Sequence, residues 1–480
     1  MSEYSPELSG LAENPSLPQR LLDHLTTVAD EDLCEALVRR DALTARQARN
    51  LARRSDPWTL RELIARGALP LQDIPPDDPW SAVAAAGRAD VPAAWIHDLA
   101  RHSDASVRVA LVEYGGHSED LLALLADDSH LAVVCAVAES AALPARLARR
   151  LAARPVLPVR DALARNTATP PDVLAALLAN GGGPPVERCG RCADLPRACG
   201  DHEAGVQALR TAALQNPATP ATGLEQFRDS PDVRVRAALA GRPDLSDELY
   251  RRLATDPDDL VRREAAANPA VGEPLIRVLA ADPDRSVRTA VTANPALPMS
   301  LLTRLAPAVR LGTGLWPRVA AASPEELRDL ARSTTAQLRA MAATRPDLPA
   351  DLAAALARDA DPSVAKRVAT HPALAPHLLH GLAERHGPSL YPSLARNPRC
   401  PPDLLHTMAV TTALGHDALL AVAQHPSASA ATLRLCLESP YERVRAAAAA
   451  NPALPVAAMV RLLEAARKPA AERNPGGRGP

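Results

Sequence analysis

Residues 268–305 read NPAVGEPLIRVLAADPDRSVRTAVTANPALPMSLLTRL, and this stretch contains the same motif twice. Asn-Pro-Ala begins at Asn268 and again at Asn294, and Arg242 marks the equivalent point 26 residues before Asn268. A fixed period of this size is typical of solenoid proteins, in which each repeat contacts only its neighbours. The 480-residue chain is therefore expected to fold as one array of repeats and not as several independent globular domains.

The register extends over nearly the whole chain, from residue 14 to about residue 465. Most equivalent positions, here called anchor positions, are 26 residues apart, and they define about 17 repeats. The anchor positions are Asn14, Arg40, Arg66, Arg88, Tyr114, Ser140, Asn166, Asn216, Arg242, Asn268, Asn294, Ala320, Arg345, His371, Asn397, His425 and Asn451. The chain accordingly divides into an N-terminal segment (1–13), helical repeats (14–180), a cysteine-rich insert in a repeat loop (181–204), helical repeats (205–465) and a disordered tail (466–480).

Each repeat is predicted to contain two short helices, here called the first and the second helix. A first helix begins near Pro298, and Leu301 and Leu305 then fall on one of its faces. In the preceding repeat, Asp282 and Pro283 suit the cap and the first position of a second helix. The Asn-Pro pair then ends that helix, because the residue before proline avoids the α region. Helices this short are unstable alone, so we expect the core to form between stacked repeats.

The segments NPALPMSLLTRLAP and ADPDRSVRTAVTANP resemble the leucine-rich repeat variant (LRV) family, which is similar in kind to HEAT and armadillo arrays. The resemblance extends over most of the chain and implies an all-α fold, a right-handed α-solenoid. In that family α and 3₁₀ helices alternate along the superhelix. A repeat architecture of this kind specifies shape and says little about the task of the protein.

Composition argues against several classes of function. The net charge is −2 and aromatic residues are 2% of the chain, which does not favour a nucleic-acid partner. No apolar run approaches the ~20 residues of a membrane span, and residues 1–10 lack the pattern of a signal peptide. We therefore expect a cytoplasmic protein with no membrane partner. Motifs of nucleotide-binding enzymes, zinc proteases and serine hydrolases are missing, so the chain is not expected to be an enzyme.

A column of arginines recurs on the second helices, and several of them follow an aspartate by four residues. The column comprises Arg108, Arg160, Arg236, Arg262, Arg288 and Arg445. One interpretation is a ladder that binds phosphates or acidic partner segments. The other is an ion pair within each helix, such as Asp232 with Arg236. The second is favoured, because the paired aspartates cancel most of the charge.

The insert contains the densest cluster of possible metal ligands in the sequence. Anchor positions Asn166 and Asn216 are 50 residues apart, which leaves 24 residues beyond one repeat. Within this insert the ligand types Cys189, Cys192, Cys199 and His202 form the pattern C-x2-C-x6-C-x2-H. Zinc accepts three cysteines and one histidine in a tetrahedral site, and such a site can fold a segment that has almost no apolar core.

Three states of the insert remain open at this stage. The LRV resemblance implies a cysteine-ligated [4Fe–4S] cluster as an alternative to zinc, although here the cysteines lie inside the array and number three. The third state holds no metal and is a loop with thiols or a CxxC redox pair. The other cysteines are predicted to be isolated small residues of the repeats. They are Cys34, Cys135, Cys400 and Cys436.

The sequence thus favours a non-enzymatic, monomeric scaffold that binds a protein or peptide partner on its concave surface and carries a metal-binding insert. One alternative is an iron–sulfur or redox-sensing protein in which the cysteine cluster is functional. Another is a HEAT-like nucleic-acid-binding protein, which would need an uncompensated basic groove.

Overall fold

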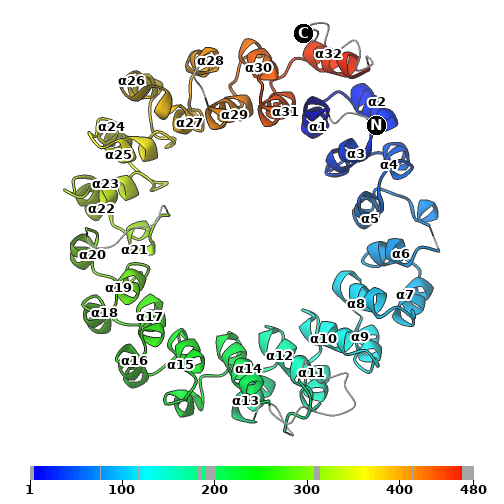
Figure 1. Ribbon diagram of the computed structural model, residues 1–480, viewed down its shortest axis with the longest axis vertical. Coiled ribbons are helices and arrows are strands. Elements are labelled where there is room, and N and C mark those ends of the chain that lie inside the picture. Colours follow the sequence, from blue (N-terminus) through cyan, green and yellow to red (C-terminus); the bar gives the residue numbers. More distant parts are fainter. Residues whose placement is uncertain are drawn as a thin grey trace, which may run out of the picture. The chain divides into compact units, whose positions relative to one another are not determined.

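A computed structural model describes residues 5–467 of the protein, except 76, 116–117, 181–184, 190–201, 308–313 and 412–414. Across these residues the protein consists of helices and their connections (Figure 1). The described part contains no β-strand, and one isolated parallel bridge joins Val156 and Arg188. The predicted all-α repeat solenoid is confirmed.

The chain forms two compact units, which we describe separately. Unit 1 combines Met1–Ile74 with Ser323–Pro480, and unit 2 comprises Pro75–Ala322. Both units are built from the same kind of repeat, with a first helix and a second helix in each. Unit 1 therefore takes its repeats from both ends of the sequence.

Unit 2 contains the following elements: α6 (Pro79–Ala85), α7 (Ala93–Ala100), α8 (Ala105–Tyr114), α9 (Glu119–Leu125), α10 (Leu131–Glu139), α11 (Ala145–Ala152), α12 (Leu157–Arg165), α13 (Pro171–Asn180), α14 (Glu203–Gln215), η2 (Leu224–Phe227), α15 (Val233–Ala240), α16 (Asp247–Ala254), α17 (Asp259–Ala267), α18 (Glu273–Leu279), α19 (Arg285–Val291), α20 (Met299–Leu305) and α21 (Pro317–Ala320).

Unit 1 contains α1 (Pro6–Glu13), α2 (Gln19–Val28), α3 (Glu31–Val38), α4 (Ala45–Ala52), α5 (Pro57–Ala65), η1 (Leu71–Asp73), α22 (Pro324–Ala331), α23 (Ala336–Ala342), α24 (Ala350–Leu356), α25 (Pro362–Val368), α26 (Pro376–His386), η3 (Gly387–Ser389), α27 (Tyr391–Leu394), α28 (Pro402–Val410), α29 (His416–Gln424), α30 (Ala430–Leu437), α31 (Glu442–Ala450) and α32 (Val456–Arg467).

Within unit 2 the helices form two rows. The second helices α8, α10, α12, α14, α15, α17 and α19 pack on one another in sequence order and lie on the concave side of the unit (Figure 1). The first helices, among them α7, α9, α11 and α13, form the outer row. Alanine is abundant on the second helices, and small side chains permit this close packing of neighbouring helices. Buried aliphatic residues between the rows, such as Val287 and Leu302, form the core.

The asparagine anchors inside the array are buried, and each of them joins its repeat to the one before it. Asn294 is 0% exposed, and its Nδ2 donates hydrogen bonds to the carbonyl oxygens of Ala266 (3.1 Å) and Asn268 (2.7 Å). Its Oδ1 accepts a hydrogen bond from the backbone N–H of Ala296 at 2.8 Å. The same pattern recurs at other asparagine anchors, namely Asn166, Asn216, Asn268, Asn397 and Asn451.

Histidine substitutes for asparagine at two anchor positions, His371 and His425. His371 is buried, and its Nε2 lies 2.7 Å from the carbonyl oxygen of Arg345, 26 residues earlier. Its Nδ1 accepts a hydrogen bond from the backbone N–H of Ala373. An imidazole therefore reproduces the acceptor of the amide and one of its two contacts with backbone carbonyl oxygens.

Two local predictions differ from the structure. The second helix after Asp282 begins at Arg285, and Asp284 caps it by accepting a hydrogen bond from the backbone N–H of Ser286 at 2.7 Å. The carboxylate of Asp282 instead accepts hydrogen bonds from Arg262. The alternation of α and 3₁₀ helices is also absent from most of the described repeats, because both the first and the second helix of each are α-helices, and the 3₁₀ helices in the described residues are η1, η2 and η3.

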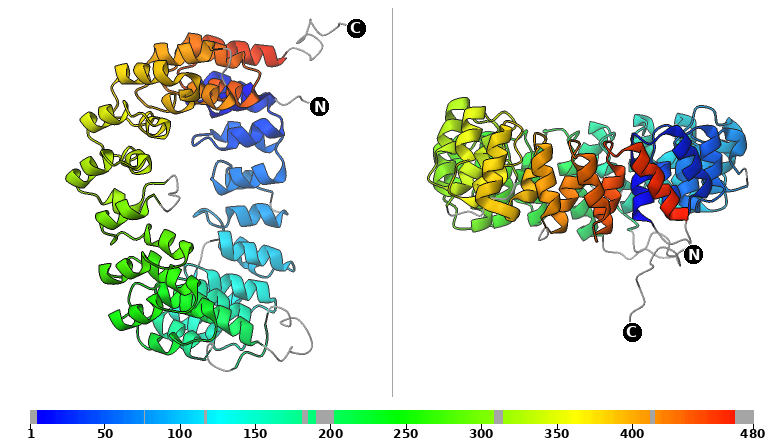
Figure 2. Two further views of the ribbon diagram at one scale, coloured as in Figure 1. Left: turned by 60° about the vertical axis from the view of Figure 1, so that its left-hand side comes forward. Right: turned by 90° about the horizontal axis from the view of Figure 1, so that it is seen from above.

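The two ends of the sequence meet within unit 1. Helix α1, which the sequence left outside the repeats, packs against α31 and α32, as Figures 1 and 2 show. The repeat that begins at Asn451 has its first helix in α32, and α1 takes the position of its second helix. We call the pair α32 and α1 the terminal repeat. It is a repeat assembled from the last and the first helix of the sequence.

Candidate functional site

The structure describes residues 185–189 and residues from 202 on at the two ends of the insert. Cys189 and His202 lie within the described residues and both are half-buried. Cys192 and Cys199 belong to residues 190–201, which lie outside the described part of the chain. In the described part, no group of three or more histidine, cysteine or acidic side chains is arranged to hold a metal ion. The four-ligand prediction therefore stays a prediction, and the structure locates the ends of the segment that would form it.

Backbone hydrogen bonds hold the Cys189 end against the preceding repeat. The backbone N–H groups of Glu187 and Arg188 donate to the carbonyl oxygen of Pro155 at 2.9 and 3.1 Å. The N–H of Leu157 donates in return to the carbonyl oxygen of Arg188 at 2.7 Å. Because Leu157 is the first residue of α12, Cys189 is placed beside the N-terminal end of that helix.

The helix that follows His202 also reaches Leu157. His202 directly precedes α14, which spans 13 residues and is longer than the other second helices. A side chain at Gly205, in the first turn of α14, would place its Cβ 2.2 Å from Cδ2 of Leu157. A Cβ there would force the Leu157 side chain to shift, so the first turn of α14 passes directly over Leu157. The segment that ends at Cys189 and the helix that follows His202 therefore both reach Leu157.

The donor set fits a tetrahedral zinc ion better than a harder cation, because thiolates and imidazole are the ligands that zinc prefers. The remaining cysteines differ from this set in their surroundings. Burial raises the pKa of the thiols of Cys34, Cys135 and Cys436 to about 11 and that of Cys400 to about 12. At neutral pH these four are protonated, isolated residues, as predicted.

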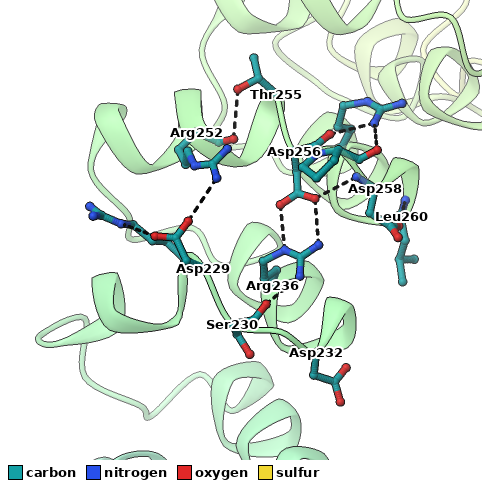
Figure 3. A network of polar contacts seen from close by, with 12 residues as sticks. Asp229, Ser230, Asp232, Arg236, Arg252, Thr255, Asp256, Asp258 and Leu260 are labelled. Carbon is teal, nitrogen blue, oxygen red and sulfur yellow. Dashed lines mark hydrogen bonds and ion pairs between the residues drawn. The ribbon is translucent and has the colours of Figure 1, made fainter.

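Three arginines of the column in unit 2 pair with a carboxylate of the next repeat and not with the aspartate that the sequence suggested, namely Arg108, Arg236 and Arg262. Nε and Nη2 of Arg236 donate to the carboxylate of Asp256, 20 residues later, at 2.9 and 3.1 Å (Figure 3). Nη1 donates to the carbonyl oxygen of Ser230 at 2.7 Å. Asp232, the partner expected within the helix, instead caps α15 by accepting from the backbone N–H of Arg234. The predicted pair between Asp232 and Arg236 is therefore wrong.

The same junction joins other pairs of consecutive repeats. Equivalent bidentate pairs connect Arg108 with Asp128, Arg262 with Asp282 and Arg339 with Asp359. The hydrogen bonds from Arg108 lower the pKa of Asp128, and those from Arg339 lower the pKa of Asp359. A carboxylate of the next repeat thus neutralises the charge of each of these arginines. These pairs argue against the interpretation of the column as a ladder that binds phosphates. The aspartate of the recurrent Asp-Pro or Asp-x-Asp connection was the signal in the sequence that could have identified the partner.

A groove that the sequence analysis did not anticipate lies on the second-helix row. It has a volume of about 600 Å³ and is formed by α14, α15 and α17, together with the turns after α14 and α15. Its floor includes Leu214, Ala237 and Ala238. Arg234 and Glu264 line its sides. The signal for it was the Ala-Ala pair in α15, because two small side chains leave space between the helices on either side.

The comparisons with known proteins find likenesses among solved structures. No family model matches the chain, and no curated protein matches it. A solved structure described as a leucine-rich repeat variant with a novel repetitive protein structural motif is similar over 52% of this chain and 87% of that chain, with 21% identity and a TM-score of 0.32. The assignment to an all-α repeat fold rests on the helices themselves. Among the described residues, none of the helices has the length and apolar character required to traverse a bilayer.

Proposed function

We propose that this protein is a non-enzymatic scaffold that binds an extended segment of a protein partner in the groove between α14, α15 and α17. The groove itself is the observation that carries the proposal. Its volume of about 600 Å³ falls in the range of sites that hold several side chains or a small ligand. Its apolar floor and polar sides are the combination that peptide-binding surfaces use for affinity and orientation.

The side chains around the groove suit a peptide of mixed polarity. The floor residues Ala237 and Ala238 are 6% and 8% exposed, so a partner side chain would rest on a firm apolar surface. Arg234 and Glu264 on its sides have side chains that are 61% and 39% exposed. Because these two charges are opposite, the groove does not select an acidic or a basic segment as a class. The thiols of the insert are not needed for this binding.

The test is a selection of peptides from a random displayed library on the full-length protein, followed by affinity measurement. Replacing exposed Gln215 on the groove with tryptophan should weaken binding of selected peptides at least about tenfold, which corresponds to ~1.4 kcal/mol. The matched control is Gln226→Trp, which makes the same substitution at an exposed site of η2 in the next repeat. If both variants bind the selected peptides with equal affinity, the peptides do not bind in the groove.

We further propose that Cys189, Cys192, Cys199 and His202 hold one zinc ion. The ion would cross-link a segment that has few apolar residues of its own, and would add its binding energy to folding. The approach of two neighbouring residues to Leu157 supports this, because Arg188 is bonded to Leu157 and Gly205 passes close to it, so the two ends of the pattern lie near one residue of α12.

Elemental analysis of protein purified with and without oxygen tests this second part. One zinc per chain is expected, and the variant Cys189→Ser/Cys192→Ser should lose it. The control Cys135→Ser, in α10, should keep it. Iron with matching sulfide, or absence of both metals, would contradict the zinc site. Neither result would affect the peptide groove.

A further inference from the structure

The terminal repeat is held together by the same chemistry as the repeats inside the array. Nδ2 of Asn14 donates hydrogen bonds to the carbonyl oxygens of Ala449 and Asn451, both at 2.8 Å. Asn451 makes the equivalent bonds to the repeat before it, at 2.8 and 2.9 Å. The first anchor of the sequence therefore bonds to the last anchor as if it followed it in the chain.

The arginine junction also continues across the two ends. Nε of Arg445 pairs with the carboxylate of Glu7, and both side chains are 22% exposed. Nη1 of Arg445 donates to the carbonyl oxygen of Ser439 at 3.0 Å, as Arg236 does to Ser230. Glu7 thus supplies the carboxylate that the following repeat would supply elsewhere. The anchor bonds and the arginine pair of an internal junction both recur here, although no peptide bond connects α32 to α1.

The fit between α1 and α31 is specific in shape. A Cβ on Gly10 would lie 2.0 Å from the carbonyl oxygen of Ala446, so the two helix backbones are in direct contact. Leu11 and Ala12, the next residues of α1, are 0% exposed. The surface of α31 consequently accepts this glycine-containing helix and excludes helices that carry a side chain at the same place.

We propose that the terminal repeat is also an interface between two copies of this chain, in which α1 of one copy docks on α31 and α32 of the other. A solenoid exposes apolar surface at both ends and normally needs capping repeats, and here each end covers the other. If the terminal repeat opens, the two freed surfaces are complementary, and a second copy can satisfy both at once.

The part of the chain that would exchange extends beyond α1. Nη1 of Arg40, just after α3, donates to the carbonyl oxygens of Ala12 and Asn14 at 2.6 and 3.0 Å, so α1 is bonded to the segment that follows it as well as to α31. The N-terminal part of unit 1 ends at Ile74, directly before Pro75. In the exchanged dimer, residues 5–74 of each copy would complete unit 1 of the other with all of these contacts intact.

A charge exchange across the interface tests this with full-length protein. Glu7→Arg faces Arg445 with a like charge, and Arg445→Glu faces Glu7 with a like charge, so each variant alone has a weakened terminal repeat. In a mixed dimer, the two introduced side chains meet as an ion pair of reversed polarity at one interface, while the second interface keeps the native pair. We expect a refolded mixture, with one variant carrying a mass tag, to form heterodimers at least about tenfold in excess of homodimers. The double variant Glu7→Arg/Arg445→Glu should be monomeric and as stable as the native chain.

Mass measurement in solution distinguishes the outcomes. A mixture that contains only monomers would overturn the proposal, and so would heterodimers and homodimers in statistical proportion. Adding Gly10→Ala to both partners should abolish the heterodimer, because the methyl group blocks docking. Gly381→Ala, in α26 with open space around its Cβ, is the matched control and should leave the heterodimer unchanged. A heterodimer that survives Gly10→Ala would place the association elsewhere.

Discussion

Replacing Asn294 with alanine should destabilise unit 2 by about 3 kcal/mol, because three hydrogen bonds of a buried side chain are lost together. The amide donates to Ala266 and Asn268 and accepts from the N–H of Ala296, at 3.1, 2.7 and 2.8 Å. Each such bond contributes about 1 kcal/mol net. Since the site is 0% exposed, water cannot replace the amide without a rearrangement of the turn.

The assay is amide hydrogen exchange of α17 and α19, with urea unfolding of the same samples. A loss of about 3 kcal/mol corresponds to an increase of roughly 100-fold in the population of the locally open state. Asn294→Asp keeps the acceptor and shape but places a carboxylate against two carbonyl oxygens. That repulsion should raise the pKa of the introduced carboxyl group, so the variant should be most stable at acid pH and lose stability as the pH rises through its native pKa.

Ser140→Ala is the matched control at an equivalent anchor. Ser140 is buried, and its hydroxyl accepts one hydrogen bond, from the N–H of Ala142 at 3.3 Å. Its loss should therefore cost about 1 kcal/mol. If Asn294→Ala and Ser140→Ala destabilise the protein equally, the two inter-repeat bonds contribute nothing. The asparagine anchors would then not stabilise the stacking of the repeats.

Three further outcomes are expected. Arg236→Ala should cost about 3 kcal/mol in urea unfolding, because it leaves the 3%-exposed carboxylate of Asp256 without its guanidinium, whereas Arg277→Ala at a 55%-exposed ion pair should cost less than about 0.5 kcal/mol. The lowered pKa values of Asp128 and Asp359 predict stability that is present above about pH 4 and is lost as the pH falls through their native pKa values. Acid titration of unfolding should show a smaller loss in Asp128→Asn than in the native chain. Mass spectrometry after alkylation at pH 8 should find three buried thiols unmodified in the folded protein and modified in urea, and early modification of any of them would contradict their burial. These are Cys34, Cys400 and Cys436.

The period of the anchors could be recognised from the sequence, but the contacts that they make could not. Asparagine before proline reads locally as a helix stop, and in the structure it ends the helix as expected. Its side chain donates hydrogen bonds to carbonyl groups 26 and 28 residues earlier, and a local sequence pattern cannot predict contacts over that separation. The arginine column shows the same limit. A separation of four residues suggested a pair within one helix, but the aspartate was needed as a cap and the arginine reached the next repeat.

The sequence by itself determined the all-α repeat architecture of this protein, because helix caps, proline positions and apolar stripes are local signals that recur with a fixed period. It also identified the insert and its candidate ligands, since their spacing needs no knowledge of the fold. Only the tertiary structure decided which side chains meet. The Arg236–Asp256 junction, the groove on the alanine pair of α15 and the docking of α1 on α31 all join residues distant in sequence. Packing in three dimensions selects such contacts, because each depends on the shape of a neighbouring repeat and not on the segment that carries the residue.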